Sequence, residues 1–419
     1  MTSPSRELSS QSDSLHEADS APPGRVLSVD ALRGFDMFWI MGAVPIVHAL
    51  EQMNKNSFTA FLSTQLSHST WEGLRFYDLI FPLFLFLVGV SIVFSLDRAL
   101  AREGRGAAVK RIVRRSILLF LLGIFYMGGL AEKWPGIALG GVLHRIAACY
   151  LLAALIYVFW GGRAKVMAGI AAIFLIGYWA LVTWVPVPDF KLDKTTVAQL
   201  AKRAGSDAPM AITDSVPGRI SGSYEEGRNL TNHLDFLLLP GKKAQTYYIN
   251  EGLLSTLPSV AICLFGIFTG RLLKTERLSP RQKVMRLLVA GAVSVAIGWL
   301  WSLQFPLIKR IWTSSFCLVA GGISAMLLAV FYQIVDVWRF QKWCRPFVWM
   351  GMNSITIYLA ANLVGFNKIA ERFVGGDVKA FLDTRVAQGF GQLVIALVGL
   401  ALAVLLCWFL HRKKIFLRV

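Results

Sequence analysis

The residues best suited to chemistry are a histidine and an aspartate ten positions apart, His68 and Asp78. Between them, Ser69 and Glu72 have the spacing of a capping box, which predicts a helix start with His68 just outside its positive end. Histidine exchanges protons near neutral pH, and a carboxylate can fix its tautomer and stabilise its cation. The pair therefore fits a general base with its supporting acid. The alternative is a histidine at headgroup level beside an interfacial aspartate.

Other charged side chains lie in apolar surroundings. Asp36 enters the first apolar stretch, and Arg145 lies several residues into another. A charge at the centre of a span costs about 2.5 to 3.5 kcal/mol on insertion scales, so each needs a partner. For Arg145 the partner is either an anionic ligand such as a phosphate or an internal carboxylate. Asp30 and Arg33 are one helical turn apart, which fits either a structural ion pair or a substrate contact.

Uncharged polar side chains also recur inside the apolar stretches. Most such residues form hydrogen bonds between neighbouring helices. Their number indicates a polar cavity within the bundle. They are Thr313, Ser314, Ser315, Asn353, Ser354 and Asn362.

The elements that must position these residues follow from composition. Of the 419 residues, 55% are apolar and 16% are charged, against about a quarter charged in a soluble domain. Stretches of about 20 apolar residues recur along the chain, and each is long enough to span a bilayer as a helix. This pattern excludes a soluble enzyme and predicts an all-α, polytopic transmembrane helix bundle.

Charge and cysteine content exclude two further classes of protein. The formal charge of +18 comes from short Lys and Arg clusters between the apolar stretches, which is typical of topology signals and lipid-headgroup contacts. We therefore expect membrane lipids as partners, and no nucleic acid. The five cysteines contain no CxxC pair, so neither a disulfide framework nor a metal site is implied.

Apolar runs bounded by charges or by Gly and Pro predict about ten spans. An even number puts both termini on one face. The short loops of that face hold an excess of Lys and Arg, which assigns it to the cytoplasm. The predicted spans are residues 33–50, 76–97, 116–130, 138–160, 166–185, 252–270, 287–305, 311–335, 346–365 and 389–411.

Three segments outside the spans are long. Residues 1–24 are rich in serine and have no apolar core, so we expect a disordered cytoplasmic tail ahead of a membrane domain over residues 25–419. The outer segments 51–75 and 186–250 exceed about 15 residues, a length that is usually functional or disordered. Within the second, the apolar residues 234–239 predict packing against the membrane domain.

Six short motifs occur in order along the chain: Arg33-Gly34, residues 68–89 (HSTWEGLRFYDLIFPLFLFLVG), 141–145 (GVLHR), 251–270 (EGLLSTLPSVAICLFGIFTG), 312–315 (WTSS) and 351–355 (GMNSI). In this order they resemble the heparan-α-glucosaminide N-acetyltransferases and their bacterial relatives. The resemblance covers nearly the whole chain after residue 25. It implies a multi-pass membrane acyltransferase that carries an acetyl group from cytoplasmic acetyl-CoA to a glycan on the far side.

The resemblance also implies roles for single residues. His68 falls on the family's catalytic histidine, and Asp78 falls on the aspartate that follows it. Arg145 matches an arginine in the family's Gly-Val-Leu-x-Arg motif, and Asn353 matches an asparagine in Gly-Met-Asn-Ser. One departure concerns the first span, where human-type members carry an asparagine and the approximate position here is Val44.

Acetyl transfer needs a base, donors for the developing oxyanion and sites for two substrates. We expect His68 to act as the base or as a transient acetyl carrier, with backbone N–H groups of residues 69–71 as oxyanion donors. Binding of acetyl-CoA is assigned to Arg145, Arg33, Asn353 and Ser314. Binding of the acceptor is assigned to Trp71 and Glu251.

Two other functions stay open. Spans with buried Asp and Arg also suit a sugar or amino-sugar transporter, and the same chemistry suits an O-acyltransferase of an envelope polysaccharide. For the acetyltransferase, the expected acceptor is an amino sugar or an envelope glycan. We expect a multi-pass protein of the bacterial inner membrane with both termini in the cytoplasm, either as a monomer or as a homodimer.

Overall fold

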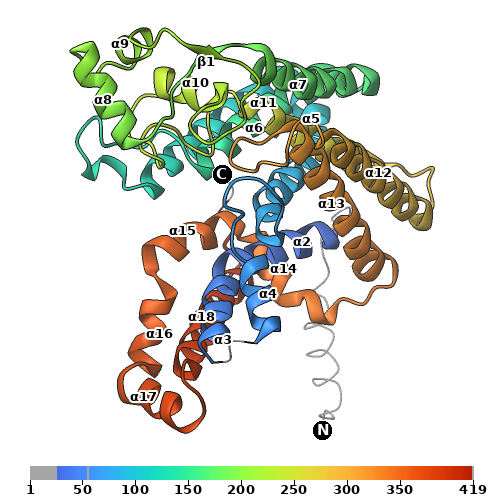
Figure 1. The fold of residues 1–419 in the computed structure, drawn as a ribbon. Helices are drawn as coiled ribbons and strands as arrows, with labels where there is room; N and C mark the ends of the chain where they lie inside the picture. Colours follow the sequence, from blue (N-terminus) through green and yellow to red (C-terminus); the bar gives the residue numbers. More distant parts are fainter. Residues whose placement is uncertain (1–25, 54–55, 418–419) are drawn as a thin grey trace, which may run out of the picture.

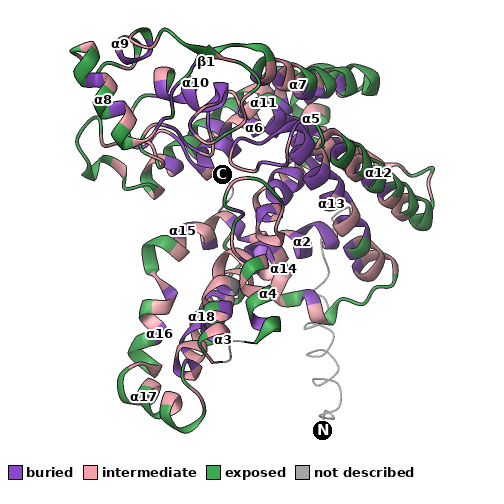
Figure 2. Ribbon diagram, in the orientation of Figure 1, coloured by how far each residue is buried: buried purple, intermediate pink, exposed green. Residues whose placement is uncertain are grey.

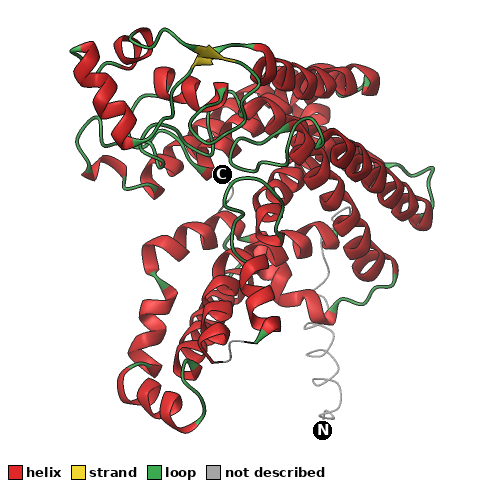
Figure 3. Ribbon diagram, viewed as in Figure 1, coloured by secondary structure: helices red, strands yellow, loops and turns green. Residues whose placement is uncertain are grey.

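The structure, a computed structural model, describes residues 26–53 and 56–417, so the predicted tail over residues 1–24 lies outside the described residues. The described part is almost entirely helical, with one short pair of strands (Figure 3). The prediction of an all-α polytopic bundle is confirmed.

Helix α5 (Ile80–Tyr126), which follows the 3-10 turn η2 (Phe76–Leu79), carries two of the predicted spans, 76–97 and 116–130. Gly104 interrupts this helix with φ 77° and ψ 178°. Glycine adopts such a positive φ at little cost because it has no Cβ. The helix is therefore bent into two arms at this residue.

Contacts with α6 (Val142–Trp160) give the directions of the two arms. Asp97, ahead of the break, accepts a hydrogen bond of 2.6 Å from Tyr157 at the far end of α6. Gly123, near the end of α5, packs against His144 at the start of α6. The arms therefore run in opposite directions, and both ends of α5 lie on one face of the bundle.

Among the described residues, seven helices are long and apolar enough to cross a membrane, or eight if one bent pair counts as a single span. The chain is thus an integral membrane protein, but with fewer such helices than the ten predicted. The number differs because α5 counts once, because the predicted span 33–50 lies in a helical run that is not among the seven, and because the predicted span 346–365 falls in the bent pair. Besides α5 and α6, the seven are α7 (Ala164–Trp184), α11 (Thr256–Lys274), α12 (Pro280–Trp301), α13 (Ser314–Tyr332) with its π-helical end η4 (Gln333–Val337), and α18 (Phe390–Arg412).

Shorter helices complete the membrane part. The predicted first span begins within α2 and continues through a π-helical turn into α3, and the bent pair meets at Asn353 with an angle of 73°. These elements are α2 (Leu27–Phe38), η1 (Trp39–Ala43), α3 (Val44–Met53), α4 (Ser57–Gln65), η3 (Gly129–Ala131), η5 (Lys342–Cys344), α14 (Arg345–Met352), α15 (Ser354–Val364), α16 (Phe366–Val374) and α17 (Gly376–Arg385).

Burial divides the spanning helices into two sets. In α5, α6 and α11, 67% of the apolar window is buried, against 17% in α12 and 28% in α7 and α18. Figure 2 shows the long exposed flank of α12. The exposed flanks carry apolar side chains such as Ile173, Leu300 and Leu405. Lipid tails can cover such surfaces, since the backbone of each helix bonds internally.

Glycines let the central helices α5 and α11 approach closely. A Cβ on Gly89 of α5 would lie 2.0 Å from the carbonyl oxygen of Cys263 in α11. A Cβ on Gly266 of α11 would lie 1.9 Å from the carbonyl oxygen of Phe86. Small residues at a crossing permit this packing, which takes the place of the hydrophobic effect between helices in lipid.

The predicted outer segment 186–250 is a small folded module at one end of the molecule (Figure 1). Within its apolar patch, residues 234–239, Phe236 is buried in the module's own core, while Leu239 lies beside Gly140 just before α6, since a Cβ on Gly140 would be 3.7 Å from its side chain. Its elements are β1 (Val187–Pro188), which pairs antiparallel with β2 (Arg219–Ile220), and α8 (Lys194–Ala204), α9 (Pro209–Asp214) and α10 (Leu230–Leu238).

Candidate active site

The segment that carries His68 is an irregular loop. The capping box expected from Ser69 and Glu72 is wrong, because no helix begins there and the next helical turn starts at Phe76. The carboxylate of Asp78 instead accepts the backbone N–H groups of Ser69 at 3.2 Å and Arg75 at 3.1 Å. The loop therefore folds around a buried carboxylate rather than into a helix.

His68 and Asp78 are in direct contact. The Nδ1 atom of His68 lies 3.0 Å from Oδ1 of Asp78; the aspartate side chain is fully buried, and that of the histidine is 49% exposed. When Nδ1–H donates to the carboxylate, Nε2 keeps the lone pair. The sequence-predicted pair thus forms a dyad whose histidine is reachable and whose counter-charge is shielded from water.

A lysine that the sequence analysis did not single out completes this cluster. Lys309, in the loop between α12 and α13, places Nζ 2.9 Å from Nδ1 and 3.1 Å from Nε2 of His68, and 3.8 Å from Asp78. Burial lowers the pKa of Lys309 to about 8, although the carboxylates of Asp78 and Glu251 oppose that shift. The only feature of the sequence that could have pointed to Lys309 is its position just before the WTSS motif, residues 312–315.

Neighbouring side chains hold the histidine loop in place. The guanidinium of Arg75 donates to Oγ of Ser67 at 2.7 Å and to the carbonyl oxygen of His68 at 2.8 Å. The ring of Tyr77 lies 4.8 Å from the imidazole, tilted by 40°. Arg75 therefore holds the backbone carbonyl of His68, and Tyr77 packs against one face of its imidazole ring.

Trp71 links the histidine loop to the outer module. Its indole Nε1–H donates to the carbonyl oxygen of Tyr224 at 2.8 Å. Tyr224 in turn bonds Thr183, near the end of α7, at 2.8 Å. Of the backbone donors expected for an oxyanion over residues 69–71, Ser69 N–H is already committed to Asp78.

Arg145 is buried, with 2% of its surface exposed. Its two terminal nitrogens donate inside the protein, whereas Nε has no hydrogen-bond partner among the described residues. One terminal nitrogen donates to the carbonyl oxygen of Ser255 at 3.0 Å and to the hydroxyl of Ser259. The other donates to the carbonyl oxygen of Gly252 at 2.9 Å and to the hydroxyl of Ser255 at 2.7 Å. The guanidinium also lies 5.2 Å from the ring of Trp312. Its partners are neutral groups ahead of and within the first turn of α11.

Asp235 holds the same segment from the other side. Its carboxylate accepts the N–H of Leu253 at 2.9 Å and that of Ile249 at 3.5 Å. Burial raises the pKa of Asp235 to about 6, although these N–H donors oppose the shift. Residues 249–255 are therefore held between Asp235 and Arg145, and Glu251 lies in the middle of this clamped segment.

The other predicted donor-binding residues come from different elements, and none of them contacts the dyad residues through a hydrogen bond among those that the structure describes. Arg33 bonds Ser91 at 2.6 Å and pairs with Asp30 at 3.3 Å, as its spacing predicted. Ser314 is buried and donates to the carbonyl oxygen of Leu175 at 2.7 Å. Asn353 is 3% exposed, and neither end of its amide has a hydrogen-bond partner among the described residues. Arg33 also donates to the carbonyl oxygen of Gly351 at 3.4 Å, two positions before Asn353.

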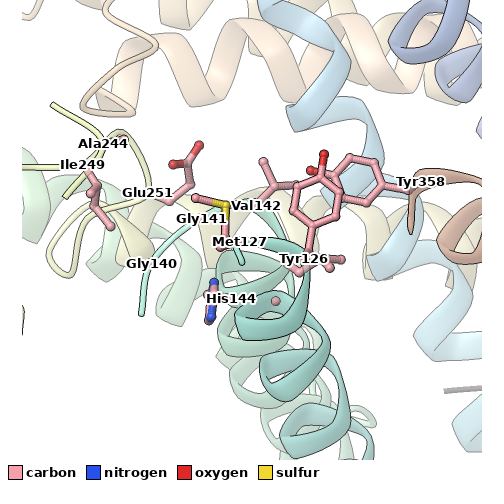
Figure 4. A pocket seen from close by; sticks show the side chains of 12 residues that line it. Tyr126, Met127, Gly140, Gly141, Val142, His144, Ala244, Ile249, Glu251 and Tyr358 are labelled. Atoms are coloured by element: carbon pink, nitrogen blue, oxygen red, sulfur yellow. The ribbon is translucent and has the colours of Figure 1, made fainter. Parts of the chain in front are cut away.

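A cavity of about 200 Å³ lies beside Glu251 (Figure 4). Tyr126 and Tyr358 line one side of it, with rings stacked 4.7 Å apart at 17°. Glu251 also influences the pKa of Lys309, which ties the cavity electrostatically to the dyad. Its lining is Gly123, Tyr126, Met127, Gly140, Gly141, Val142, Leu143, His144, Ala244, Ile249, Glu251 and Tyr358.

Comparison with known proteins gives consistent matches. Residues 25–197 match a family model described as the catalytic part of heparan-alpha-glucosaminide N-acetyltransferase. The chain is 24% identical to the human protein named heparan-alpha-glucosaminide N-acetyltransferase, over 96% of this chain and 61% of that relative. It is 24% identical to the mouse protein of the same name, over 98% of this chain and 64% of the relative. The chain therefore spans a little under two thirds of the length of these relatives.

Proposed function

We propose that the chain belongs to the heparan-α-glucosaminide N-acetyltransferase-like family of multi-pass membrane proteins, whose family model matches residues 25–197 and whose human and mouse members are 24% identical to it, and that it is a membrane acetyltransferase. It moves an acetyl group from cytoplasmic acetyl-CoA to an amino sugar or glycan on the outer face. The observation that carries this proposal is the His68–Asp78 dyad, with a buried carboxylate and a half-exposed imidazole 3.0 Å apart. A substrate can reach the imidazole of His68, while the carboxylate of Asp78 is shielded from water.

In the proposed reaction the amine nitrogen attacks the thioester carbonyl carbon, and His68 takes the proton from that nitrogen. The C–S bond then breaks, its electron pair leaves with sulfur, and the proton on His68 passes to the CoA thiolate. Asp78 stabilises the intermediate imidazolium. Lys309, whose Nζ lies against the imidazole, is the nearest cation to a developing oxyanion.

His68 has a second proposed role, as a transient acetyl carrier. In that case an imidazole nitrogen attacks the thioester carbonyl carbon, and the C–S bond breaks with its electron pair leaving on the CoA thiolate. The amine nitrogen then attacks the acetyl carbonyl carbon, the bond between that carbon and the imidazole nitrogen breaks, and the proton lost by the amine neutralises the thiolate. Incubation with labelled acetyl-CoA and no acceptor distinguishes the two routes. Label retained on the wild-type protein and missing from His68→Ala supports the carrier, whereas no label supports direct transfer.

The side chains proposed to bind acetyl-CoA and the acceptor differ in how many hydrogen bonds they already make inside the protein. For acetyl-CoA, Asn353 offers a buried amide with both ends free of hydrogen bonds in the described residues, and Arg33 keeps a partly exposed guanidinium. The internal hydrogen bonds of Arg145 and Ser314 favour a structural role for these two residues over the donor contact expected from the sequence. On the outer side, Trp71 and Glu251 flank the acceptor.

One assay separates this function from its rivals. Purified protein in detergent should release CoA thiol from acetyl-CoA when glucosamine or a glycan is added. A sugar transporter would instead take up sugar into vesicles without CoA. An O-acyltransferase would acetylate a hydroxyl of a sugar that carries no amine. Uptake without CoA, together with no thiol release, would contradict the proposal.

The cellular setting is part of the same proposal. We infer a bacterial inner-membrane protein with both termini in the cytoplasm, because short clusters of Lys and Arg favour that face. Protease protection of tags at the two termini in intact spheroplasts tests the orientation. The mass of the protein–detergent complex, corrected for detergent, distinguishes a monomer from a homodimer.

A further inference from the structure

The site is built on two loops that have no regular secondary structure. The histidine loop covers residues 66–75, and the lysine loop, which carries Lys309, covers residues 302–313. One backbone hydrogen bond of 2.8 Å, from the N–H of Gly73 to the carbonyl oxygen of Leu307, joins them directly. Because a lysine ammonium stands on a flexible four-carbon stem, this bond by itself does not fix Nζ of Lys309 against the imidazole.

A short segment of the outer module contacts both loops. The carbonyl oxygen of Tyr224 accepts the indole N–H of Trp71, in the histidine loop, at 2.8 Å. Two residues later, the carboxylate of Glu226 accepts the guanidinium of Arg310, in the lysine loop, at 3.0 Å. Arg310 directly follows Lys309 in the chain. The same segment therefore holds each loop close to the residue that it contributes to the site.

This segment has its own anchors, which do not involve the two loops. Tyr248, which is 3% exposed, donates its hydroxyl hydrogen to the carboxylate of Glu226. The hydroxyl of Tyr224 shares a hydrogen bond of 2.8 Å with that of Thr183, near the end of α7. The carboxylate that binds Arg310 is thus held in place from inside the module.

Charge explains why the lysine loop needs this contact. Lys309 and Arg310 are neighbouring cations, and the positive charge of Arg310 opposes that of Lys309. Glu226 draws Arg310 to the module and offsets its charge. The side chains of Arg310 and Glu226 are 28% and 39% exposed, and an ion pair this exposed adds little to global stability. Its effect is local, on the position of the lysine loop.

We propose that Glu226 is a positioning residue: by binding Arg310 it keeps the ammonium of Lys309 against the imidazole of His68. Its catalytic meaning rests on the proposed acetyltransferase reaction, in which Lys309 stabilises the developing oxyanion. The position of the lysine loop can be measured without turnover. The outer module is then part of the catalytic machinery as well as a cover over it.

The first experiment measures hydrogen–deuterium exchange of the peptide over residues 302–313, in full-length protein in detergent without substrates. The N–H of Trp312 in this peptide bonds the carbonyl oxygen of Lys309 at 3.0 Å, so its exchange reports opening of the turn at the lysine. Wild type is compared with Glu226→Ala and with the matched control Glu225→Ala. Thermal midpoints check that each variant is folded.

Exchange of this peptide should be about threefold faster in Glu226→Ala, the factor expected for losing an ion pair of this exposure. Glu225 binds Arg228 at 3.1 Å instead, so Glu225→Ala should match wild type. Arg310→Ala removes the same contact but leaves Tyr248 on Glu226, so it should also give faster exchange, even if Glu226→Ala does not fold. Unchanged exchange in these folded variants, or an equal rise in Glu225→Ala, would overturn the proposal.

The second experiment measures release of CoA thiol with glucosamine as the acceptor. Glu226→Ala should lower kcat about threefold, in line with the same local opening, and leave KM unchanged. In a Lys309→Met background, Glu226→Ala should cause no further loss, because Glu226 acts through the lysine. Additive losses would show an effect that does not pass through Lys309 and would overturn the proposal, as would faster exchange with an unchanged kcat.

The two experiments separate failure of the positioning role from failure of the reaction. If wild type releases thiol and Glu226→Ala changes neither exchange nor kcat, the acetyltransferase stands and the positioning role is refuted. If wild type never releases thiol but exchange responds to Glu226→Ala alone of the two acid variants, the contact that holds the lysine loop stands and the proposed reaction fails.

Discussion

The two side chains of the dyad differ in solvent exposure, and the chemistry of the dyad depends on this difference. Asp78 is fully buried and accepts two backbone N–H groups as well as the imidazole, while the side chain of His68 is 49% exposed. Asp78 therefore holds the backbone of the histidine loop, in addition to its proposed role in catalysis. Substitutions at the two positions should have different effects on stability.

Replacing His68 with Ala should remove acetyl transfer and leave folding intact. A general acid/base group contributes about 10² to 10⁴ in rate, and a half-exposed side chain provides little packing. Thiol release and the thermal midpoint are measured on the same sample. A variant that keeps more than about a third of wild-type activity would show that another group is the base.

Replacing Asp78 with Asn should lower both activity and the thermal midpoint. The amide keeps the shape but has one acceptor oxygen instead of two, so it can no longer serve the imidazole and both backbone donors equally. Activity should fall less than in His68→Ala, because the base itself remains. A larger loss in Asp78→Asn, at an unchanged midpoint, would reverse the roles assigned to the two residues.

Lys309 should make stability rise with pH above 8. Its pKa in the folded protein is about 8, against 10.5 as the ordinary value, so the folded state loses this proton first. Between these values the unfolded chain holds more protons, and the free energy of unfolding rises by up to about 1.4 kcal/mol per pH unit. Lys309→Met should lack this rise between pH 8 and 10, whereas the exposed Lys202→Met should keep it. Equal pH profiles for wild type and Lys309→Met would contradict the prediction.

At the scale of elements, the clamp on residues 249–255 decides how the start of α11 meets α6 and the outer module. Arg145 supplies the hydrogen bonds on one side and Asp235 those on the other. No side-chain hydrogen bond of Glu251 is found within residues 26–53 and 56–417. Its place in the cavity depends on Arg145, whose partners in this segment lie 107 and 110 positions away, and on Asp235, which lies 18 positions from Leu253.

Arg145→Ala should lower the thermal midpoint of the protein without ligand. It removes the guanidinium donors from buried oxygens of Gly252, Ser255 and Ser259, and each hydrogen bond lost from such a buried group costs about 1 to 3 kcal/mol. The thermal midpoint of Arg145→Lys should lie between those of wild type and Arg145→Ala, because one ammonium group cannot make all the hydrogen bonds of a planar guanidinium. The rise in midpoint on adding CoA should be the same in all three proteins. A shrunken CoA effect at an unchanged midpoint would instead make Arg145 a donor contact.

At the scale of the whole molecule, the crossing of α5 and α11 joins the two parts of the site. The loop with His68 leads into α5, and the segment with Glu251 leads into α11. Gly89→Ala and Gly266→Ala would each put a Cβ about 2 Å from a carbonyl oxygen of the facing helix. Both should lower the detergent midpoint strongly or prevent folding, because two buried backbones must separate. Gly177→Ala in α7, where a Cβ meets nothing within 4 Å, is the control and should be neutral or stabilising. Wild-type stability of both crossing variants would refute the close approach.

Local features of the chain were predictable from the sequence. The helical, membrane-spanning character follows from long apolar runs, because a backbone in lipid must bond within its own segment. The dyad residues were identified from a motif contained in one short stretch, residues 68–89. The Asp30–Arg33 pair followed from the helical repeat. The helix expected at Ser69 failed because a carboxylate nine residues later takes its backbone N–H.

What only the tertiary structure decided is which distant groups meet. Lys309 reaches His68 across 241 positions, and Arg145 bonds atoms 107 to 114 positions away, half of them backbone carbonyls. Backbone carbonyls are identical at every residue, so no pattern of side chains marks the ones that a buried arginine will use. The composition determined that these polar groups need partners inside an apolar bundle, and the packing of α5, α6 and α11 determined which partners they have.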